Sequence, residues 1–431
     1  MAFQRAGAWA GASVLVATSL LIAGPTTARA QQTTEVSRSL IPPSFANLGK
    51  SLADKGVYFQ MSYVGDILAN VSGGRHTGAY YAGEFSFGTT LDLQKLAGIT
   101  GGSLHIVFDE RSGNSVSPAV GTNFGLAGNH GPNNVIRLAN FYYEQALFHD
   151  RLDITAGRTN PTADFATSAI SCQFLSNIFC AQPGIWYFGL NDNQPYPQST
   201  WGGRVNFQIT PEVYLRVGGY QDDPTQVIGQ GFTWRWDHGV GAFIPYELGY
   251  VTTFAGARYP SKFDIGGYYD TGTFSRPATP LLLERGRTAY WVQGQQVVWR
   301  PNPATQQSLT VFAGAMIQSK GYAPYWGEYY GGLFLQGPFA SRPADTVGFA
   351  AAYLPLNHAA SPFYSNEWIF ELNYGYNVLP GVTLKPTVQY VVHPDEIGFP
   401  FPRKVSNAFV IGGQISVDFG ALFGFPQFVP Y

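Results

Sequence analysis

The sequence predicts an all-β protein, namely a transmembrane, antiparallel up-and-down β-barrel of about 16 strands with short periplasmic turns and long extracellular loops. Three observations predict this fold: the composition, an export signal, and alternating strands joined by connections of alternating length. Only 12% of the 431 residues are charged, about half of the roughly 25% that is usual in soluble domains. Aromatic residues make up 16%. Few charges and many aromatic side chains suit a wall that meets lipid on one face and water on the other.

The first 30 residues have the pattern of a secretory signal peptide. Arg5 supplies the positive start, residues 12–23 form an apolar run too short to span a bilayer comfortably, and ARA at 28–30 is a small-x-small cleavage motif. A retained membrane anchor is the alternative. We expect the mature chain to begin near Gln31 and to be exported to the outer membrane of a Gram-negative bacterium.

The remaining sequence excludes several classes of protein. After residue 30 no apolar run reaches the ~18–20 residues that a membrane helix needs. Residues 1–30 contain two arginines and no acid, so their removal changes the formal charge from −2 to −4. This balance lacks the basic footprint of nucleic-acid binding, and no nucleic acid, cofactor or metal is expected. A secreted all-β protein remains an alternative.

The chain divides into four parts. They are a signal peptide (1–30), an N-terminal periplasmic segment with a candidate short helix (31–56), the barrel (57–419) and a C-terminal tail (420–431). Alternating apolar and polar residues predict the strands, at 57–68, 79–93, 102–110, 135–148, 151–158, 199–209, 212–221, 240–252, 261–271, 287–299, 306–317, 327–335, 345–354, 366–377, 382–391 and 408–419.

The connections between these strands alternate in length. Tight turns follow Phe148 (HDR), Ile209 (TPE) and Asn377 (VLPG), whereas long links start at Arg111 and Thr159. Counted from a periplasmic N-terminus, the three tight turns fall on the same rim, as in outer-membrane barrels. No helical stretch is long enough for a βαβ crossover, and no fixed repeat suggests a propeller. A barrel of this many strands is too wide for side chains to fill, so a lumen is expected.

Each predicted strand has an apolar and a polar face. In 408–419, Phe409, Ile411 and Ile415 share one face, and Gln414 and Ser416 share the other. The polar faces carry Asn, Gln, Thr, Ser and Tyr with a few ions of both signs, a lining suited to hydrated neutral solutes. Aromatic residues near strand ends suggest an interfacial girdle, with ordinary core packing as the alternative for each: Tyr142, Tyr143, Tyr220, Tyr268, Tyr269, Trp299, Tyr329 and Tyr330.

The chain contains two cysteines, Cys172 and Cys180. In an exported protein with no metal-ligand spacing nearby, a short-loop disulfide is the leading interpretation. Two unpaired thiols are the alternative.

Several stretches resemble the carbohydrate-selective porin family, often called the OprB family, of Gram-negative outer membranes. They run from the first predicted strand to the last and cover essentially the whole mature chain. The stretches are YVGDILANVSGG (63–74), LDLQKLAG (91–98), FYYEQALFHDRLDITAGR (141–158), GGLFLQGPFASRPADTVGFAAAY (331–353), LKPTVQYVVHP (384–394) and AFVIGGQISVDF (408–419).

The resemblance implies a sixteen-stranded barrel that lets monosaccharides such as glucose diffuse down a gradient. In this family, outer loops fold inward to narrow the pore, and the link 159–198 is the natural constriction loop. It contains both cysteines, and a disulfide there would keep the constriction at a fixed size. The resemblance also implies a lumen with arginines and acidic and aromatic partners.

Lumen parity then selects candidate pore-lining residues. A sugar presents hydroxyl groups that donate and accept hydrogen bonds, and apolar C–H faces that aromatic rings can cover. For every candidate the alternative is a barrel-wall ion pair that never touches solute. Parity gives the donors Arg204, Arg216 and Lys385 and the acceptors Glu84, Glu144, Glu247 and Glu371. Further candidates are Arg158, at the exit of strand 151–158, and the rings of Trp186 and Tyr187 in the link 159–198.

Other functions remain open at this point. A general diffusion porin would share everything except the sugar preference. An outer-membrane or secreted β-enzyme is a remote alternative, because no G-x-S-x-G and no H-E-x-x-H motif occurs, and we expect no enzyme. A soluble, secreted binding protein is a third class. The expected partners are outer-membrane lipid and lipopolysaccharide, sugar solutes and, since porins of this size often form trimers, a homotrimer.

Overall fold

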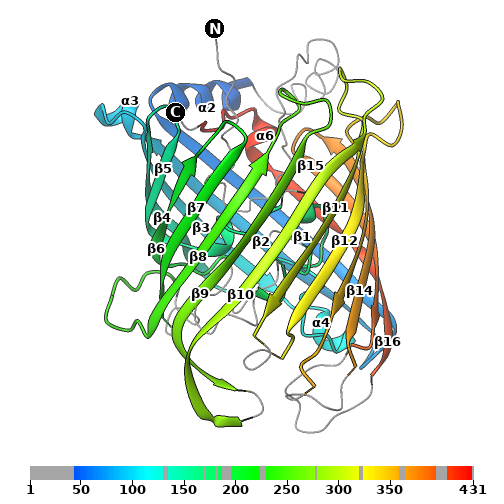
Figure 1. Cartoon of the computed structure of the whole chain (residues 1–431). Coiled ribbons are helices and arrows are strands. Elements are labelled where there is room, and N and C mark those ends of the chain that lie inside the picture. Colours follow the sequence, from blue (N-terminus) through cyan, green and yellow to red (C-terminus); the bar gives the residue numbers. More distant parts are fainter. Residues whose placement is uncertain are drawn as a thin grey trace.

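In the computed structural model, the described part of the chain forms one closed barrel of sixteen antiparallel strands (Figure 1). The structure describes residues 43–129, 134–168, 170–179, 183–186, 196–223, 230–276, 279–319, 324–358, 365–394 and 405–429. Consecutive strands pair with each other, and β1 pairs with β16 to close the ring. Every strand therefore has a partner on both edges, which leaves no exposed sheet edge in the membrane. The predicted fold class is confirmed.

The strands occupy almost the ranges that alternation predicts. They are β1 (Val57–Gly74), β2 (Gly78–Asp92), β3 (Gly102–Gly113), β4 (Ile136–Leu147), β5 (Leu152–Thr159), β6 (Thr200–Gln208), β7 (Val213–Asp222), β8 (Gly241–Val251), β9 (Ser261–Arg276), β10 (Thr279–Trp299), β11 (Ser308–Gln318), β12 (Gly327–Gln336), β13 (Thr346–Leu354), β14 (Glu367–Leu379), β15 (Val382–Val392) and β16 (Ser406–Asp418).

The largest difference lies in β9 and β10, which pair with each other far beyond the predicted ranges. Their register continues through Thr288↔Tyr269 to Leu283↔Ser275. Two prolines, Pro277 and Pro280, together with Gly286 interrupt the alternating pattern there, so the sequence suggests a loop where a longer hairpin forms.

The tight turns after β4, β6 and β14 and the described chain ends lie at one rim, the upper one in Figure 1. The described ranges contain the short α-helices α2 (Pro43–Asp54), α3 (Leu93–Ala97), α4 (Ser117–Val120) and α6 (Phe419–Phe423), and the 3-10 helices η1 (Pro161–Ala163) and η2 (Ser171–Gln173). Of these, α2 precedes β1 and α6 follows β16 at the upper rim, which we take as periplasmic. The longest connections, after β3, β5 and β7, lie at the opposite rim. The predicted signal peptide, residues 1–30, lies outside the described residues.

None of the helices in the described ranges is long and apolar enough to cross a bilayer.

The segment after β16 packs against α2. Asp418 accepts the Ala421 N–H through Oδ1 at 3.0 Å and caps the start of α6. The rings of Phe45 and Phe423 stack at 5.2 Å between centroids. Gly49 has no side chain where the Phe425 ring lies, because a Cβ there would come within 2.5 Å of it.

The faces of β16 follow the prediction. Phe409, Ile411 and Ile415 are exposed on the outside of the barrel, and Ser416 is buried. The inside is less polar than predicted, because Phe243, Tyr268, Trp291 and Phe312 belong to one buried apolar cluster with residues of two long loops. The main apolar core of this barrel therefore lies within the ring of strands.

The predicted girdle is correct for only part of its members. Tyr269, Trp299 and Tyr329 are exposed on the outer surface, whereas Tyr142, Tyr220, Tyr268 and Tyr330 are buried. In Tyr142-Tyr143 and Tyr268-Tyr269 adjacent residues point to opposite faces, so one member of each pair must point inward.

Candidate functional site

The connection between β5 and β6 folds into the barrel. We call its described residues (160–168, 170–179, 183–186 and 196–199) the inserted segment. Asn160 begins it, accepting the Thr162 N–H at 2.8 Å through Oδ1 and donating from Nδ2 to the Gln198 carbonyl at 2.6 Å. This single amide joins the two ends of the segment, so both ends are fixed at the rim while the middle reaches the opposite wall.

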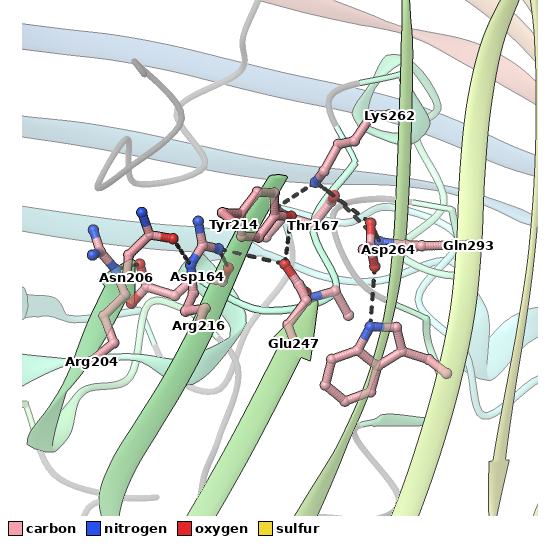
Figure 2. A network of polar contacts seen from close by, with 12 residues as sticks. Asp164, Thr167, Arg204, Asn206, Tyr214, Arg216, Glu247, Lys262, Asp264 and Gln293 are labelled. Atoms are coloured by element: carbon pink, nitrogen blue, oxygen red, sulfur yellow. Dashed lines mark hydrogen bonds and ion pairs between the residues drawn. The ribbon is translucent and has the colours of Figure 1, made fainter. Parts of the chain in front are cut away.

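Asp164 docks the first part of the inserted segment on β6 and β7. Its Oδ1 accepts Arg204 Nε at 2.6 Å, and its Oδ2 accepts the Tyr220 hydroxyl at 3.2 Å. Arg216 donates to the Asp164 carbonyl oxygen. Figure 2 shows Arg204 and Arg216 converging on this residue. Two of the predicted lumen donors therefore face inward, and both contact the inserted segment.

Arg204 is the centre of a buried charge cluster. Besides Asp164 it contacts Asp153, and its NH2 lies 3.4 Å from Glu144 Oε1. The other oxygen of Glu144 lies 2.9 Å from His105 Nε2. The Arg204 side chain has no exposed surface. A buried cation with several carboxylates at this distance is held in place by charge and by hydrogen bonds together.

Three wall glutamates accept backbone N–H groups of the inserted segment. Glu247 on β8 accepts Ala166 N at 2.6 Å, and Glu328 on β12 accepts Ile185 N at 2.9 Å. Glu371 on β14 accepts Leu175 N at 2.7 Å and Ser176 N at 3.0 Å. Charge-assisted hydrogen bonds of this kind are stronger than those between neutral groups. Glu247 and Glu371 were predicted as lumen acceptors. Glu328 was not, although it directly precedes the outward-facing Tyr329 in the strand and therefore points inward.

A second group of contacts holds residue 167. Lys262 donates to the Thr167 carbonyl oxygen, and Gln293 Nε2 donates to the same oxygen at 3.3 Å. Asp264 lies beside them, accepting Trp291 Nε1 at 3.1 Å and Gln293 Nε2 at 3.2 Å. Figure 2 shows the resulting polar chain from Arg204 to Asp264. The sequence reasoning missed Lys262 and Asp264, whose i, i+2 spacing in a strand places them on one face.

The far side of the inserted segment is held by β14 and β15. Lys385 Nζ donates to the Gln173 carbonyl at 2.8 Å, and Asn373 Nδ2 donates to it at 3.2 Å. Lys385, the third predicted donor, thus also faces inward and contacts the segment. Cys172 lies next to this point, and Cys180 lies outside the described residues, so the disulfide stays a prediction.

The connection between β3 and β4 also enters the barrel and pairs with the inserted segment. The Asn177 N–H donates to the Gly125 carbonyl at 2.8 Å, and Gly128 N donates to the Leu175 carbonyl at 2.7 Å. Gln389 donates from the wall to the Leu126 carbonyl at 2.9 Å. No periodic signal in the sequence pointed to this pairing of two loops.

The ring of Trp186 is completely buried. It packs against Trp291, Tyr268 and Phe243 at 5.3, 5.4 and 5.6 Å between ring centroids. Its predicted neighbour in the pore, Tyr187, lies outside the described residues.

The two remaining candidates differ from this group. Glu84 pairs with Arg111 at 2.6 Å, and the two side chains keep 10% and 12% of their surface exposed. Arg158 points to the outer face of the wall. Thr155 is the cross-strand partner of the inward-facing Arg204 and so shares its face, and Arg158 follows Thr155 by an odd number of residues. Its cross-strand neighbours are Phe141 and Trp201. The structure thus brings Arg204, Arg216, Glu144 and Glu247 together on one side of the barrel interior and places Glu371 and Lys385 on the other side, whereas Arg158 lies on the outer face.

The chain is similar to known proteins over most of its length. A family model described as carbohydrate-selective porin, OprB family, matches residues 76–419. Porin B of Pseudomonas aeruginosa is 27% identical over 412 residues, which cover 85% of this chain and 88% of that protein. The putative porin QuiX of Acinetobacter baylyi is 26% identical over 412 residues, with 86% and 91% covered. The high-pH structure of Pseudomonas putida OprB is 25% identical, has a TM-score of 0.79, and the match covers 86% of this chain and 96% of that one.

Proposed function

The chain belongs to the OprB family of carbohydrate-selective porins, and from this premise we propose that monosaccharides such as glucose diffuse through its lumen past a constriction made by the inserted segment. As a member of this family it is a porin of the Gram-negative outer membrane, and the solutes that cross it are carbohydrates.

One observation carries the proposal of a fixed constriction. The inserted segment is bound by inward-facing side chains from opposite sides of the barrel, by Arg204 and Glu247 on one side and by Glu371 and Lys385 on the other. A segment held from several directions has little freedom to move aside. This anchoring supports a pore whose width is set by the fold and is the same for every solute.

The chemistry of the remaining lumen suits neutral sugars. Side chains that keep some exposed surface inside the barrel include Arg111 and Glu84, a donor and an acceptor side by side. A sugar hydroxyl can accept from the guanidinium and donate to the carboxylate in place of water. Because each side chain already has a partner, the gain on binding is small, which permits fast release. We propose this pair as a solute contact and assign the buried Arg204 a positioning role.

Planar-bilayer recordings test the proposed function. We expect glucose and other monosaccharides to reduce the ion current through a single channel more than disaccharides or uncharged polyols of similar size. Equal reduction by all three classes would instead indicate a general diffusion porin with this fold. The expected homotrimer stays a prediction, which chemical cross-linking in native membranes tests.

A further inference from the structure

A short aromatic segment lies on the outside of the barrel, away from the solute pathway. We call residues 231–237, in the connection between β7 and β8, the aromatic strap. Every second residue from 232 to 236 is aromatic, and Phe232, Trp234 and Trp236 are exposed by 50%, 45% and 68%. The connection that contains it is the green loop beside the lower end of β6 in Figure 1.

The strap is fastened at both ends. The Leu138 N–H donates to the Gln230 carbonyl at 2.9 Å just before it, and Gln221 Nε2 donates to the Trp236 carbonyl at 2.8 Å near its end. These contacts fix the strap against the extracellular ends of the neighbouring strands.

The aromatic rings of the strap pack on outward-facing rings of the wall. Trp236 stacks on Trp201 at 4.5 Å with an angle of 10° between ring planes. Trp234 contacts Phe141 edge-on at 5.3 Å. Trp201 and Phe141 each lie three residues from a residue of the lumen cluster, Arg204 and Glu144, and so point to the opposite face. The strap therefore covers the outer wall of β4 and β6.

Arg158 lies beneath this cover. Its guanidinium donates from NH1 to the Thr233 carbonyl of the strap at 2.7 Å and from NH2 to the Ser199 carbonyl at 2.7 Å. It also lies over the ring of Trp201, at 5.8 Å from the centroid. A cation on the lipid face of a barrel is destabilising by about 2–4 kcal/mol at the bilayer midplane and less near the interfaces. The strap provides an acceptor for this cation and separates it from the surroundings.

We propose that the aromatic strap is a docking surface for lipid of the outer leaflet. The strap is continuous with a surface that already faces lipid. Val205 and Phe207 lie on the same outer face of β6 as Trp201, and both are exposed. It lies at the extracellular ends of its supporting strands, where tryptophan is enriched at the membrane interface. Its one charged pair, Arg235 and Asp237, is neutral as a whole and exposed, with NH2 and Oδ2 2.5 Å apart. A neutral, aromatic surface suits the boundary between acyl chains and headgroups.

Quenching of tryptophan fluorescence by brominated lipid tests the proposal. The full-length protein and its Trp234→Phe, Trp236→Phe double variant are reconstituted in phosphatidylcholine vesicles brominated either near the headgroup or near the acyl end. In each lipid, the emission spectrum of the wild type minus that of the double variant gives the emission of the strap tryptophans. A Trp186→Phe variant serves as the matched control, because Trp186 is buried inside the barrel.

The expected result is loss of most of the strap emission with bromine near the headgroup, a smaller loss with bromine near the acyl end, and no loss of the Trp186 emission. Strap emission that responds to aqueous iodide and to neither brominated lipid would overturn the proposal. Strap emission shielded from both quenchers, together with a change of oligomeric state in the double variant, would identify a second copy of the chain as the occupant and would equally overturn it.

Discussion

Arg204 Nε lies 2.6 Å from Asp164 Oδ1, and this ion pair joins the wall strand β6 to the inserted segment. The two residues are far apart in sequence, and both are buried. The Asp164 carbonyl and its second carboxylate oxygen are also hydrogen-bonded, to Arg216 and Tyr220. Asp164 is thus the point at which three wall residues hold the inserted segment.

Replacing Asp164 by asparagine should loosen this part of the segment. Arg204 would keep Asp153 and Glu144, so we expect a moderate loss of unfolding free energy, about 1–3 kcal/mol. Single-channel conductance should rise and the preference for monosaccharides should fall. Asp237→Asn is the matched control, since it removes an exposed carboxylate from an arginine pair outside the pore. Conductance and preference that stay at the wild-type level in Asp164→Asn would show that the segment does not set the pore width.

The three anchoring glutamates should differ in their tolerance of glutamine. Glu371 accepts four hydrogen bonds, two from the segment backbone and two from Asn373 and Gln389. An amide NH2 in place of either oxygen would face donors, so Glu371→Gln should destabilise the protein by about 1–3 kcal/mol and widen the pore.

Glu328→Gln is the internal comparison for this experiment. Only Oε2 of Glu328 has a hydrogen-bond partner among the described residues, and the amide group can take the position of Oε1. We expect near-wild-type conductance and denaturant stability. Equal effects of the two substitutions on single-channel conductance would contradict the assigned anchoring geometry.

The predicted bond between Cys172 and Cys180 should restrict the inserted segment. A disulfide that closes a loop of this length stabilises by about 2–3 kcal/mol through the unfolded state. We expect no thiol to react with a maleimide in the denatured, unreduced protein, and a wider, less selective channel after reduction. The Cys172→Ser, Cys180→Ser double variant should reproduce the reduced channel without reductant. Two reactive thiols before reduction would show that the bond is absent.

A turn at the periplasmic rim should make stability depend on pH. Burial alone would raise the pKa of Asp345, but hydrogen bonds from Arg342 at 2.8 and 2.9 Å and from Tyr374 at 2.5 Å outweigh it and lower the pKa below its usual value. A carboxylate with a lowered folded-state pKa adds stability above its unfolded-state pKa, and this contribution disappears as the pH falls through the folded-state value.

The matching measurement compares the unfolding free energies of the wild type and Asp345→Asn, obtained by denaturant titration at several pH values. The variant should be less stable at pH 7, and the difference should shrink as the pH falls below about 4. A difference that stays constant with pH would show that the carboxylate charge does not contribute.

Alternation along the strands was sufficient to predict most of the fold. A wall that separates lipid from a lumen requires apolar and polar residues to alternate along every strand. The tight turns at one rim do not interrupt this alternation. Where prolines interrupt the period, as at Pro277 and Pro280, the extended hairpin of β9 and β10 was missed. The orientation of Arg158 could have been found by the same parity, because it lies three residues after Thr155.

The partners of the inward-facing residues could not be predicted. Parity indicates that Glu247 and Glu371 point inward but contains no information on the loop that meets them. The docking of Ala166 and Leu175 depends on how the inserted segment turns across the lumen, and its residues have no repeating pattern. The burial of Trp186 has the same origin, since the sequence gives no sign of the apolar cluster formed inside the ring.

The contact between Phe45 and Phe423 bears on how the barrel is completed. The pairing of β1 with β16 closes the longest loop in the chain, although the entropy of closure grows only with the logarithm of loop length. These pairs have the greatest separation in sequence and therefore gain least from local structure. Because α2 and α6 adjoin the two strands of this seam and pack together outside the sheet, the contact between the chain ends stabilises the pairing of β1 with β16.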